Sequence, residues 1–227
     1  MLHKETVPPN LLEVLETLLK ISHLNNYRLV GGTALSLQYG HRQSVDIDLF
    51  TDKEFDDEMV LIGLRENFST IENERVSLNG ITCLIKGIKV DIYSWKAGFI
   101  RDAIVKEGIR MASAEEIAAM KLDAISMRVT KKDYYDIVEL LDHFSLKEMI
   151  GFYSQKYPRS DIRMVIDAFT DFNRNTIDLE NSEDPITLKN LTWNNVKGKV
   201  VEAFSSFVKN EKKEKTEEVK KRKEGKK

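Results

Sequence analysis

Residues 29–50, with the sequence LVGGTALSLQYGHRQSVDIDLF, hold the most informative set of chemistry-bearing residues in this chain. Gly31 and Gly32 follow a short apolar run and precede a segment that can form a helix, so a phosphate could approach exposed backbone N–H groups there. Asp46 and Asp48 alternate within a second apolar run, which on a strand places both carboxylates on one face. Backbone donors for phosphate beside paired acidic metal ligands predict a site for Mg²⁺-dependent phosphoryl or nucleotidyl transfer.

A third carboxylate would complete a two-metal site, and Asp91 in the run IKVDIYSW is the candidate. It is an acidic residue in an otherwise apolar strand, where an unpaired charge would be costly to bury. Together with Asp46 and Asp48 it would bind two Mg²⁺ ions, which activate an attacking oxygen and stabilise a leaving pyrophosphate. The alternative is that Asp46 and Asp48 are ordinary carboxylates at a strand end, facing water. D-x-D alone is common, and the Gly-Gly-Thr turn before it and Asp91 after it favour the metal site.

The residues beside these carboxylates each allow two interpretations. Thr33 either helps a helix N-terminus to bind the triphosphate or serves only as the N-cap of that helix. Gly31 and Gly32 could likewise form a plain turn that needs a positive φ. His41 and Arg42 lie just before the acidic strand, where they either contact substrate phosphate or base or form solvated surface.

The later part of the chain supplies a second set of charged candidates. Lys121 lies among apolar residues, so its ammonium needs a partner, and a triphosphate oxygen is suited to it. Alternatively, its stem lies along apolar surface with the head in water. Arg128 shares the helical face of Lys121. Asp133 either favours the N-terminal dipole of its own helix or pairs with Arg128 or Lys121 and orients it. Lys132 and Asp136, in the same segment KKDYYDIVELL, complete the set.

Hydrophobic periodicity predicts an α+β fold, with a mixed β-sheet and flanking helices followed by a helical domain. Strands are expected near residues 27–30, 45–50, 69–77, 81–87 and 88–95, with helices near 11–24, 33–39, 55–67, 114–129, 132–144, 145–157, 160–172 and 192–210. Ser113 and Glu116 match the capping box that opens a helix. The predicted domains are residues 1–110 (α/β), 111–208 (helical) and 209–227 (a charged tail).

Composition limits the protein class. The 227 residues carry a net charge of -2, yet the segment after residue 208 is basic and the rest acidic. With one apolar residue, that tail is either a solvated helical extension or disordered. Cys83 is the single cysteine, so no disulfide can form within the chain, and a buried structural role is expected for it. Neither a signal peptide nor a run of about 18 apolar residues is present, which predicts a cytoplasmic protein with no membrane partner.

The combination of LVGGTALSLQYGHRQSVDIDLF, IKVDIYS, ASAEEIAAMKLDAISMR and KKDYYDIVELL resembles the AbiEii/AbiGii-type nucleotidyltransferases of the DNA polymerase β-like superfamily. These are the toxins of type IV abortive-infection and related toxin–antitoxin systems. The resemblance spans about residues 10–160 in matching order and implies a minimal nucleotidyltransferase sheet followed by a helical domain, with an NTP bound between them.

The resemblance also implies roles for particular residues. Gly32 and Thr33 would hold the triphosphate, Asp46 and Asp48 would bind Mg²⁺, and Lys121 would match the phosphate-binding lysine of the family. Asp133 or Asp136 would match a later acidic motif, and Asp91 the third carboxylate of the superfamily, which varies among its toxin-type members.

The activity implied is transfer of NMP from an NTP to an acceptor hydroxyl. The expected partners are an NTP, an acceptor such as tRNA or another RNA, and a cognate antitoxin protein. Two alternatives stay open. One is a non-catalytic module that binds a nucleotide or a protein on the same fold. The other, less favoured, is a metal-dependent nuclease or phosphodiesterase, since paired carboxylates also serve hydrolysis.

Overall fold

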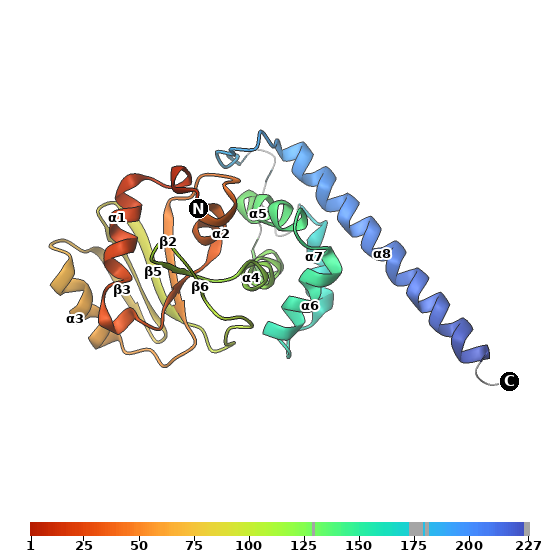
Figure 1. The fold of residues 1–227 in the computed structure, drawn as a ribbon, viewed down its shortest axis with the longest axis horizontal. Helices are drawn as coiled ribbons and strands as arrows, with labels where there is room; N and C mark the ends of the chain where they lie inside the picture. Colours follow the sequence, from red (N-terminus) through yellow and green to blue (C-terminus); the bar gives the residue numbers. More distant parts are fainter. Residues whose placement is uncertain (129, 173–178, 180–181, 225–227) are drawn as a thin grey trace.

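A computed structural model describes residues 1–128, 130–172, 179 and 182–224 of the chain. In it a mixed seven-stranded sheet, with strand order β3-β4-β5-β2-β1-β7-β6, lies on one side and a group of helices on the other (Figure 1). We call the part through β7 the sheet half and the part from α4 onward the helical half. The predicted α+β class is confirmed.

The elements follow one another in an order close to that expected. The sheet half contains α1 (Pro9–Leu18), β1 (Arg28–Leu29), α2 (Gly31–Tyr39), β2 (Asp46–Thr51), α3 (Asp57–Asn67), β3 (Glu72–Ser77), β4 (Gly80–Ile85), β5 (Ile88–Ser94), β6 (Ile104–Lys106) and β7 (Ile109–Met111), with short 3₁₀ turns at Lys4–Thr6 and Ser22–Leu24. The helical half contains α4 (Ala114–Met127), α5 (Lys131–Leu141), α6 (Leu146–Lys156), α7 (Ile162–Phe169) and α8 (Trp193–Glu224).

The centre of the sheet is formed by β2, which pairs in parallel with β5 and antiparallel with β1. The strands expected near residues 81–87 and 88–95 form the antiparallel β4–β5 hairpin, and β3 is an edge strand whose side chains are all exposed. Sequence reasoning missed the β6–β7 hairpin, because its strands have three residues each and carry polar side chains. Nevertheless β7 extends the sheet, pairing in parallel with β1 through Leu29 and Met111.

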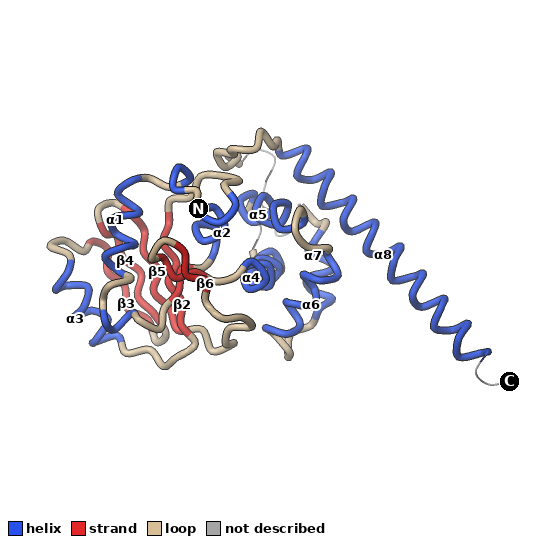
Figure 2. Tube along the Cα trace, in the orientation of Figure 1, coloured by secondary structure: helices blue, strands red, loops and turns tan. Residues whose placement is uncertain are grey.

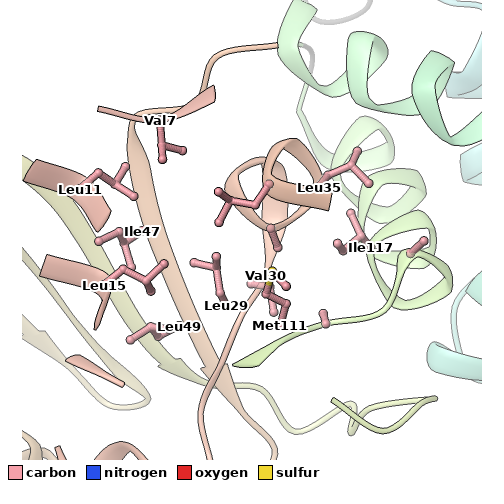
Figure 3. Close-up of a cluster of buried hydrophobic side chains, with 14 of the residues drawn as sticks. Val7, Leu11, Leu15, Leu29, Val30, Leu35, Ile47, Leu49, Met111 and Ile117 are labelled. Atoms are coloured by element: carbon pink, nitrogen blue, oxygen red, sulfur yellow. The ribbon is translucent and has the colours of Figure 1, made fainter. Parts of the chain in front are cut away.

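The hydrophobic core covers one face of the central strands. Leu11 and Leu15 of α1 pack towards Ile47 and Leu49 of β2, which alternate with the acidic residues of that strand (Figure 3). Leaving these apolar side chains in water would cost about 2 kcal/mol each, so the register of β2 is fixed by its buried face. The opposite face, with Asp46 and Asp48, therefore points away from α1.

The helical half is built around α4, which packs against α5, α6 and α7 (Figure 2). The Ser113 side chain caps this helix by accepting from the Glu116 backbone N–H at 3.3 Å. The expected capping box is only half formed, because the Glu116 side chain turns elsewhere. Its carboxylate accepts from the Ile100 N–H at 2.7 Å and lies 2.5 Å from the ammonium of Lys156.

The C-terminal segment forms one continuous helix, α8, which extends beyond the other helices (Figure 1). The charged tail is thus a helical extension through Glu224, and the domain boundary expected at 209 falls within α8; the domain limits stay predictions. Between the helices expected near 160–172 and 192–210, residues 173–178, 180 and 181 lie outside the described residues. None of the helices in the described part of the chain has the length and apolar character needed to cross a bilayer.

We expect deletion of residues 212–227 to change the melting temperature by less than about 4 °C. Among the described side chains of that segment, the contact to the body is Lys147 with Glu214, and an exposed ion pair contributes about 1 kcal/mol or less. Differential scanning calorimetry of the full and shortened chains checks this. The matched comparison is Val200→Ala, a buried position of the same helix, which should lower the melting temperature further.

Candidate active site

The three predicted metal-binding carboxylates lie on adjacent strands of the sheet. The parallel pairing of β2 and β5 sets Asp48 directly beside Asp91, and Asp46 beside Lys89. Side chains on a strand alternate between faces, so all four project from the face that α1 leaves open. The structure thus brings together residues 43 positions apart in the sequence, as the metal-site interpretation requires.

The ionised form of Asp48 is disfavoured by its burial and, to a smaller extent, by this pairing with Asp91. Its burial, followed by the neighbouring Asp91 carboxylate, raises the pKa of Asp48 to about 6, although Lys121 acts in the opposite direction. Asp91 is stabilised locally, because the Thr82 hydroxyl donates to it at 2.7 Å and the Lys89 ammonium pairs with it. Two carboxylates forced side by side favour a cation between them.

The donor set fits a divalent cation. Carboxylate oxygens are hard ligands, and a cation placed between Asp48 and Asp91 would relieve their repulsion. In the described part of the chain no three acidic, histidine or cysteine side chains already converge as a metal cluster. Two ammonium groups lie there instead, Lys89 on Asp91 and Lys132 at 3.7 Å from Asp46, both on half-exposed flexible stems. Binding a metal would therefore require these lysines to move aside.

Helix α2 begins beside the carboxylates. Gly31 opens it with φ +69°, a left-handed conformation that favours glycine. A Cβ added to Gly31 would lie 2.8 Å from Oδ2 of Asp48, so the backbone there and the carboxylate are in direct proximity. The residue before the helix, Val30, provides no side-chain cap. The first N–H groups of α2 are thus placed where an anion next to Asp48 would be bound.

Thr33 is not the N-cap of α2, so that interpretation is wrong. Its hydroxyl hydrogen-bonds to Ser44 at 2.8 Å and donates to the Asp46 carbonyl at 2.5 Å. Thr33 therefore lies inside the first turn of α2 and is not its N-cap. It fastens the helix start to the strand that carries the carboxylates.

A buried carboxylate, Asp136 of α5, organises the next group. The Arg42 guanidinium donates to both of its oxygens, at 2.6 and 2.9 Å, and the His41 ring lies 2.7 Å away. The Lys121 ammonium lies 2.5 Å from Oδ2 of Asp136. Gly32 leaves space for the Arg42 guanidinium, because a Cβ on Gly32 would lie 2.0 Å from it.

His41 and Arg42 are only 2% and 3% exposed, so their interpretation as solvated surface is wrong. Burial alone would raise the pKa of Asp136, but Arg42 and Lys121 outweigh it and hold that pKa well below its usual value. Gly32 therefore has two neighbours. It belongs to the first turn of α2, where phosphate binding was predicted, and it also packs against Arg42 and Asp136.

Lys121 is buried and held by two aspartates. Its ammonium lies 2.7 Å from Asp133 as well as 2.5 Å from Asp136, so the interpretation with its head in water is wrong. Asp133 also accepts from Thr130 at 2.6 Å and from Arg128 at 3.2 Å. The expected pairing of Asp133 with Arg128 and Lys121 is confirmed. Burial opposes ionisation of Asp133, but Lys121 and then Arg128 prevail and lower its pKa to about 2.

The predicted residues thus form two connected layers. The first, on the open face, contains the three carboxylates with the start of α2, and Lys132 of the helical half approaches it at Asp46, whereas the exposed Arg128 pairs with Asp133 of the second layer. The second, in the interior, joins His41, Arg42, Lys121, Asp133 and Asp136. Sequence reasoning missed two residues that contact Asp91. Thr82 lies on the neighbouring strand β4, and Lys89 lies two residues before Asp91 on β5. The i, i+2 spacing of Lys89 and Asp91 was the signal available.

Comparison with known proteins identifies the family. The family model described as "Nucleotidyl transferase AbiEii toxin, Type IV TA system" matches residues 13–106 and 101–217. The chain belongs to the AbiEii nucleotidyltransferase family. An uncharacterised protein of Aquifex aeolicus (strain VF5) is 31% identical over 166 residues, which are 70% of this chain and 80% of that protein. The family assignment makes the chain a nucleotidyltransferase, and the resemblance noted in the sequence is confirmed.

Solved structures agree with this fold. A protein of H. pylori crystallised as a candidate nucleotidyltransferase superposes with a TM-score of 0.55 and 17% identity, covering 93% of this chain and 95% of the other. MenT4, a nucleotidyltransferase toxin from Mycobacterium tuberculosis, has a TM-score of 0.50 and 14% identity, covering 85% and 80%. At such identities the likeness concerns the fold, and the site must be argued from the residues of this chain.

We expect Asp136→Asn to lower the free energy of unfolding by about 3 kcal/mol at pH 7, because buried Arg42 and Lys121 lose a charged partner. Since the pKa of Asp136 is lower in the folded protein, its contribution is complete above the unfolded value of 3.8 and is lost as the pH falls below it. The difference between wild type and variant should therefore shrink between pH 4 and pH 2. Urea unfolding at several pH values measures it.

The control for this experiment is Asp142→Asn. Asp142 pairs with Lys199 at 3.0 Å on the surface, so its loss should cost less than about 1 kcal/mol. Equal effects of the two substitutions at pH 7 would contradict the importance given to Asp136.

Proposed function

We propose that this protein transfers NMP from a Mg²⁺-bound NTP to an acceptor hydroxyl, as the toxin of a type IV-like toxin–antitoxin or abortive-infection system. One observation carries the proposal. The in-register pair Asp48 and Asp91 lies directly beside the N-terminus of α2, at Gly31. This combines a cation site with an anion site, and the arrangement supports an NTP as the substrate.

Each residue of the open face has a separate task in this proposal. Asp46, Asp48 and Asp91 would hold Mg²⁺, which neutralises charge on the phosphates and activates the attacking oxygen. The backbone N–H groups at the start of α2 bind phosphate oxygens. Arg128 and Lys132, two cations of the helical half with exposed side chains, pair with Asp133 and Asp46 and would turn from these partners towards a triphosphate.

Lys121 acts from a fixed position. Its two aspartate partners keep the ammonium charged and hold it in one orientation behind the open face, and its charge acts on Asp48. The acceptor oxygen then bonds to the α-phosphorus, the bond from that phosphorus to pyrophosphate breaks, and the acceptor proton is released. Asp133 and Asp136 contribute by positioning Lys121.

The acceptor proposed is an RNA, with tRNA as the leading candidate, and the proposed protein partner is a cognate antitoxin. The family to which the chain belongs is described as a type IV toxin family. MenT4, which shares the fold, is named a nucleotidyltransferase toxin. The basic residues after position 208 support attraction to a phosphate backbone. We propose the cytoplasm as the site of action, where NTP, Mg²⁺ and RNA occur together.

We expect Asp48→Asn to reduce nucleotide transfer by at least about 1,000-fold, because it removes a charged oxygen ligand at the centre of the site. Incubation with each α-labelled NTP, Mg²⁺ and total RNA or cell extract measures transfer. Asp52→Asn is the matched control, since Asp52 lies just past the same strand and pairs only weakly with Lys53 at 3.5 Å. Transfer retained by Asp48→Asn would refute the proposal. Binding of Mg²⁺–NTP without pyrophosphate release by the wild type would favour the non-catalytic binding module.

Metal removal should abolish transfer and change stability in a defined direction. We expect Mg²⁺ at ten times its dissociation constant to raise the free energy of unfolding of the wild type by about 1.4 kcal/mol. In Asp48→Asn the increase should be absent, because the Asp48 carboxylate no longer binds the ion. Thermal melts with EDTA and with increasing Mg²⁺ check this. An equal increase in both proteins would contradict the assignment of Asp48 as a ligand.

A further inference from the structure

Three aromatic side chains continue the open face of the sheet beyond the carboxylates. Phe50 follows Asp48 by two residues on β2, Tyr93 follows Asp91 by two on β5, and the register pairs Phe50 with Tyr93. Trp95 comes a further two residues along the chain. Since a strand rises about 3.3 Å per residue, the Phe50–Tyr93 pair begins about 7 Å from the Asp48–Asp91 pair on the same face.

These side chains form a partly exposed aromatic surface. The Phe50 and Trp95 rings are stacked, with centroids 5.9 Å apart and planes inclined by 25°, and Phe50 and Tyr93 are 6.0 Å apart. Trp95 is 39% exposed, and Phe50 and Tyr93 are only partly buried. Trp193, by contrast, is 5% exposed and packs in the core. A large aromatic ring left open beside a catalytic face is available for a ligand with a flat π-surface.

The aromatic surface is also held in place. A Cβ on Gly80 would lie 2.3 Å from the Tyr93 ring, so this ring lies flat against the glycine of the next strand. The Tyr93 hydroxyl is 3.1 Å from the Thr82 hydroxyl, which donates to Asp91 at 2.7 Å. The backbone N–H of Trp95 donates to the backbone carbonyl of Thr51 at 2.7 Å, which fixes the main chain that carries the indole. Hydrogen bonds thus connect the aromatic surface with the carboxylate nearest to it.

The position of this surface separates it from the phosphate end of the site. Helix α2 contacts β2 at Asp46, through Thr33, and Lys132 of α5 also approaches Asp46. Phe50 lies at the opposite end of β2, paired with Arg28 of β1. A triphosphate bound at the start of α2 and by Lys132 lies at Asp46 and Asp48, so a molecule over Phe50 and Trp95 reaches the carboxylates from the opposite end of β2.

We propose that Phe50, Tyr93 and Trp95 form a stacking site for the nucleobase at the reacting end of a single-stranded RNA acceptor. Aromatic side chains next to a basic residue are a common means of binding unpaired bases. Arg28, whose guanidinium stacks on Phe99 at 3.6 Å, supplies such a cation beside Phe50. Tyr134 and Tyr135 of α5 are 0% and 1% exposed, so they cannot stack on a base. The inference rests on the proposed function and specifies the chemistry of its acceptor.

The test uses a short single-stranded RNA whose 3′-terminal base is 2-aminopurine, and a second RNA that lacks this base. We expect Trp95→Ala to weaken binding of the first RNA by about 5- to 150-fold, the range that aromatic–base stacking supplies, and to leave the second almost unchanged. Trp95→Phe should retain most of the affinity. Leu78→Ala, at an equally peripheral and 91% exposed position, is the control and should have no effect. Thermal melts of each variant establish that it is folded.

Several outcomes would overturn the inference. Equal affinity of Trp95→Ala and wild type for the RNA, equal losses for the two RNAs, or no RNA binding by the wild type would each do so. In a second arm, 2-aminopurine riboside triphosphate with Mg²⁺ replaces the RNA. A loss confined to this arm would assign the aromatic surface to the base of the NTP. The proposed function is tested separately, since Asp48→Asn should abolish transfer whether or not Trp95 contacts the RNA.

Discussion

The arrangement of this molecule depends on one buried carboxylate, Asp136. It accepts two hydrogen bonds from Arg42, lies within 2.7 Å of His41, and pairs with Lys121 on its other side. Arg42 and His41 belong to the segment between α2 and β2, whereas Lys121 and Asp136 belong to the helical half. Burying any of these charges alone would be strongly unfavourable, so they are stable only when the two halves are together. The sheet half and the helical half are therefore held together by the same contacts that keep Lys121 charged.

Carboxylates in this protein serve opposite purposes according to their surroundings. Asp133 and Asp136 have several cationic partners, and their pKa values are lowered. Asp48, partly buried and set beside Asp91 by the pairing of two strands, has its pKa raised to about 6. The first two are satisfied and structural, and the third retains an unmet charge. A carboxylate with a raised pKa beside the start of a helix is what distinguishes the open face of the sheet, proposed as the catalytic face, from the interior.

The groups proposed to bind the phosphates, the metal and the acceptor base all lie along one face of the sheet. From one end to the other it presents the start of α2, the carboxylates on β2 and β5, and then the aromatic residues that follow them at the same two-residue spacing. The opposite face of the same strands is apolar and covered by α1 (Figure 3). Strand alternation therefore gives each strand two roles at once. The buried residues fix the register, and the register brings Asp48 beside Asp91 and Phe50 beside Tyr93.

The sequence by itself determined the α+β class, most elements, the pairing of Asp46 with Asp48 on one face and the family, because these depend on local periodicity and on motifs in order. It did not reveal the β6–β7 hairpin, whose strands are too short for a period to be read. Nor did it decide between surface and interior for His41, Arg42 and Lys121, since charged residues are usually exposed. Only the tertiary structure placed them around Asp136, set Asp91 beside Asp48 and left Trp95 open while burying Tyr134. These positions depend on which distant segments of the chain contact each other. A charged side chain is buried only where an oppositely charged partner meets it, and local sequence patterns do not show where that partner lies.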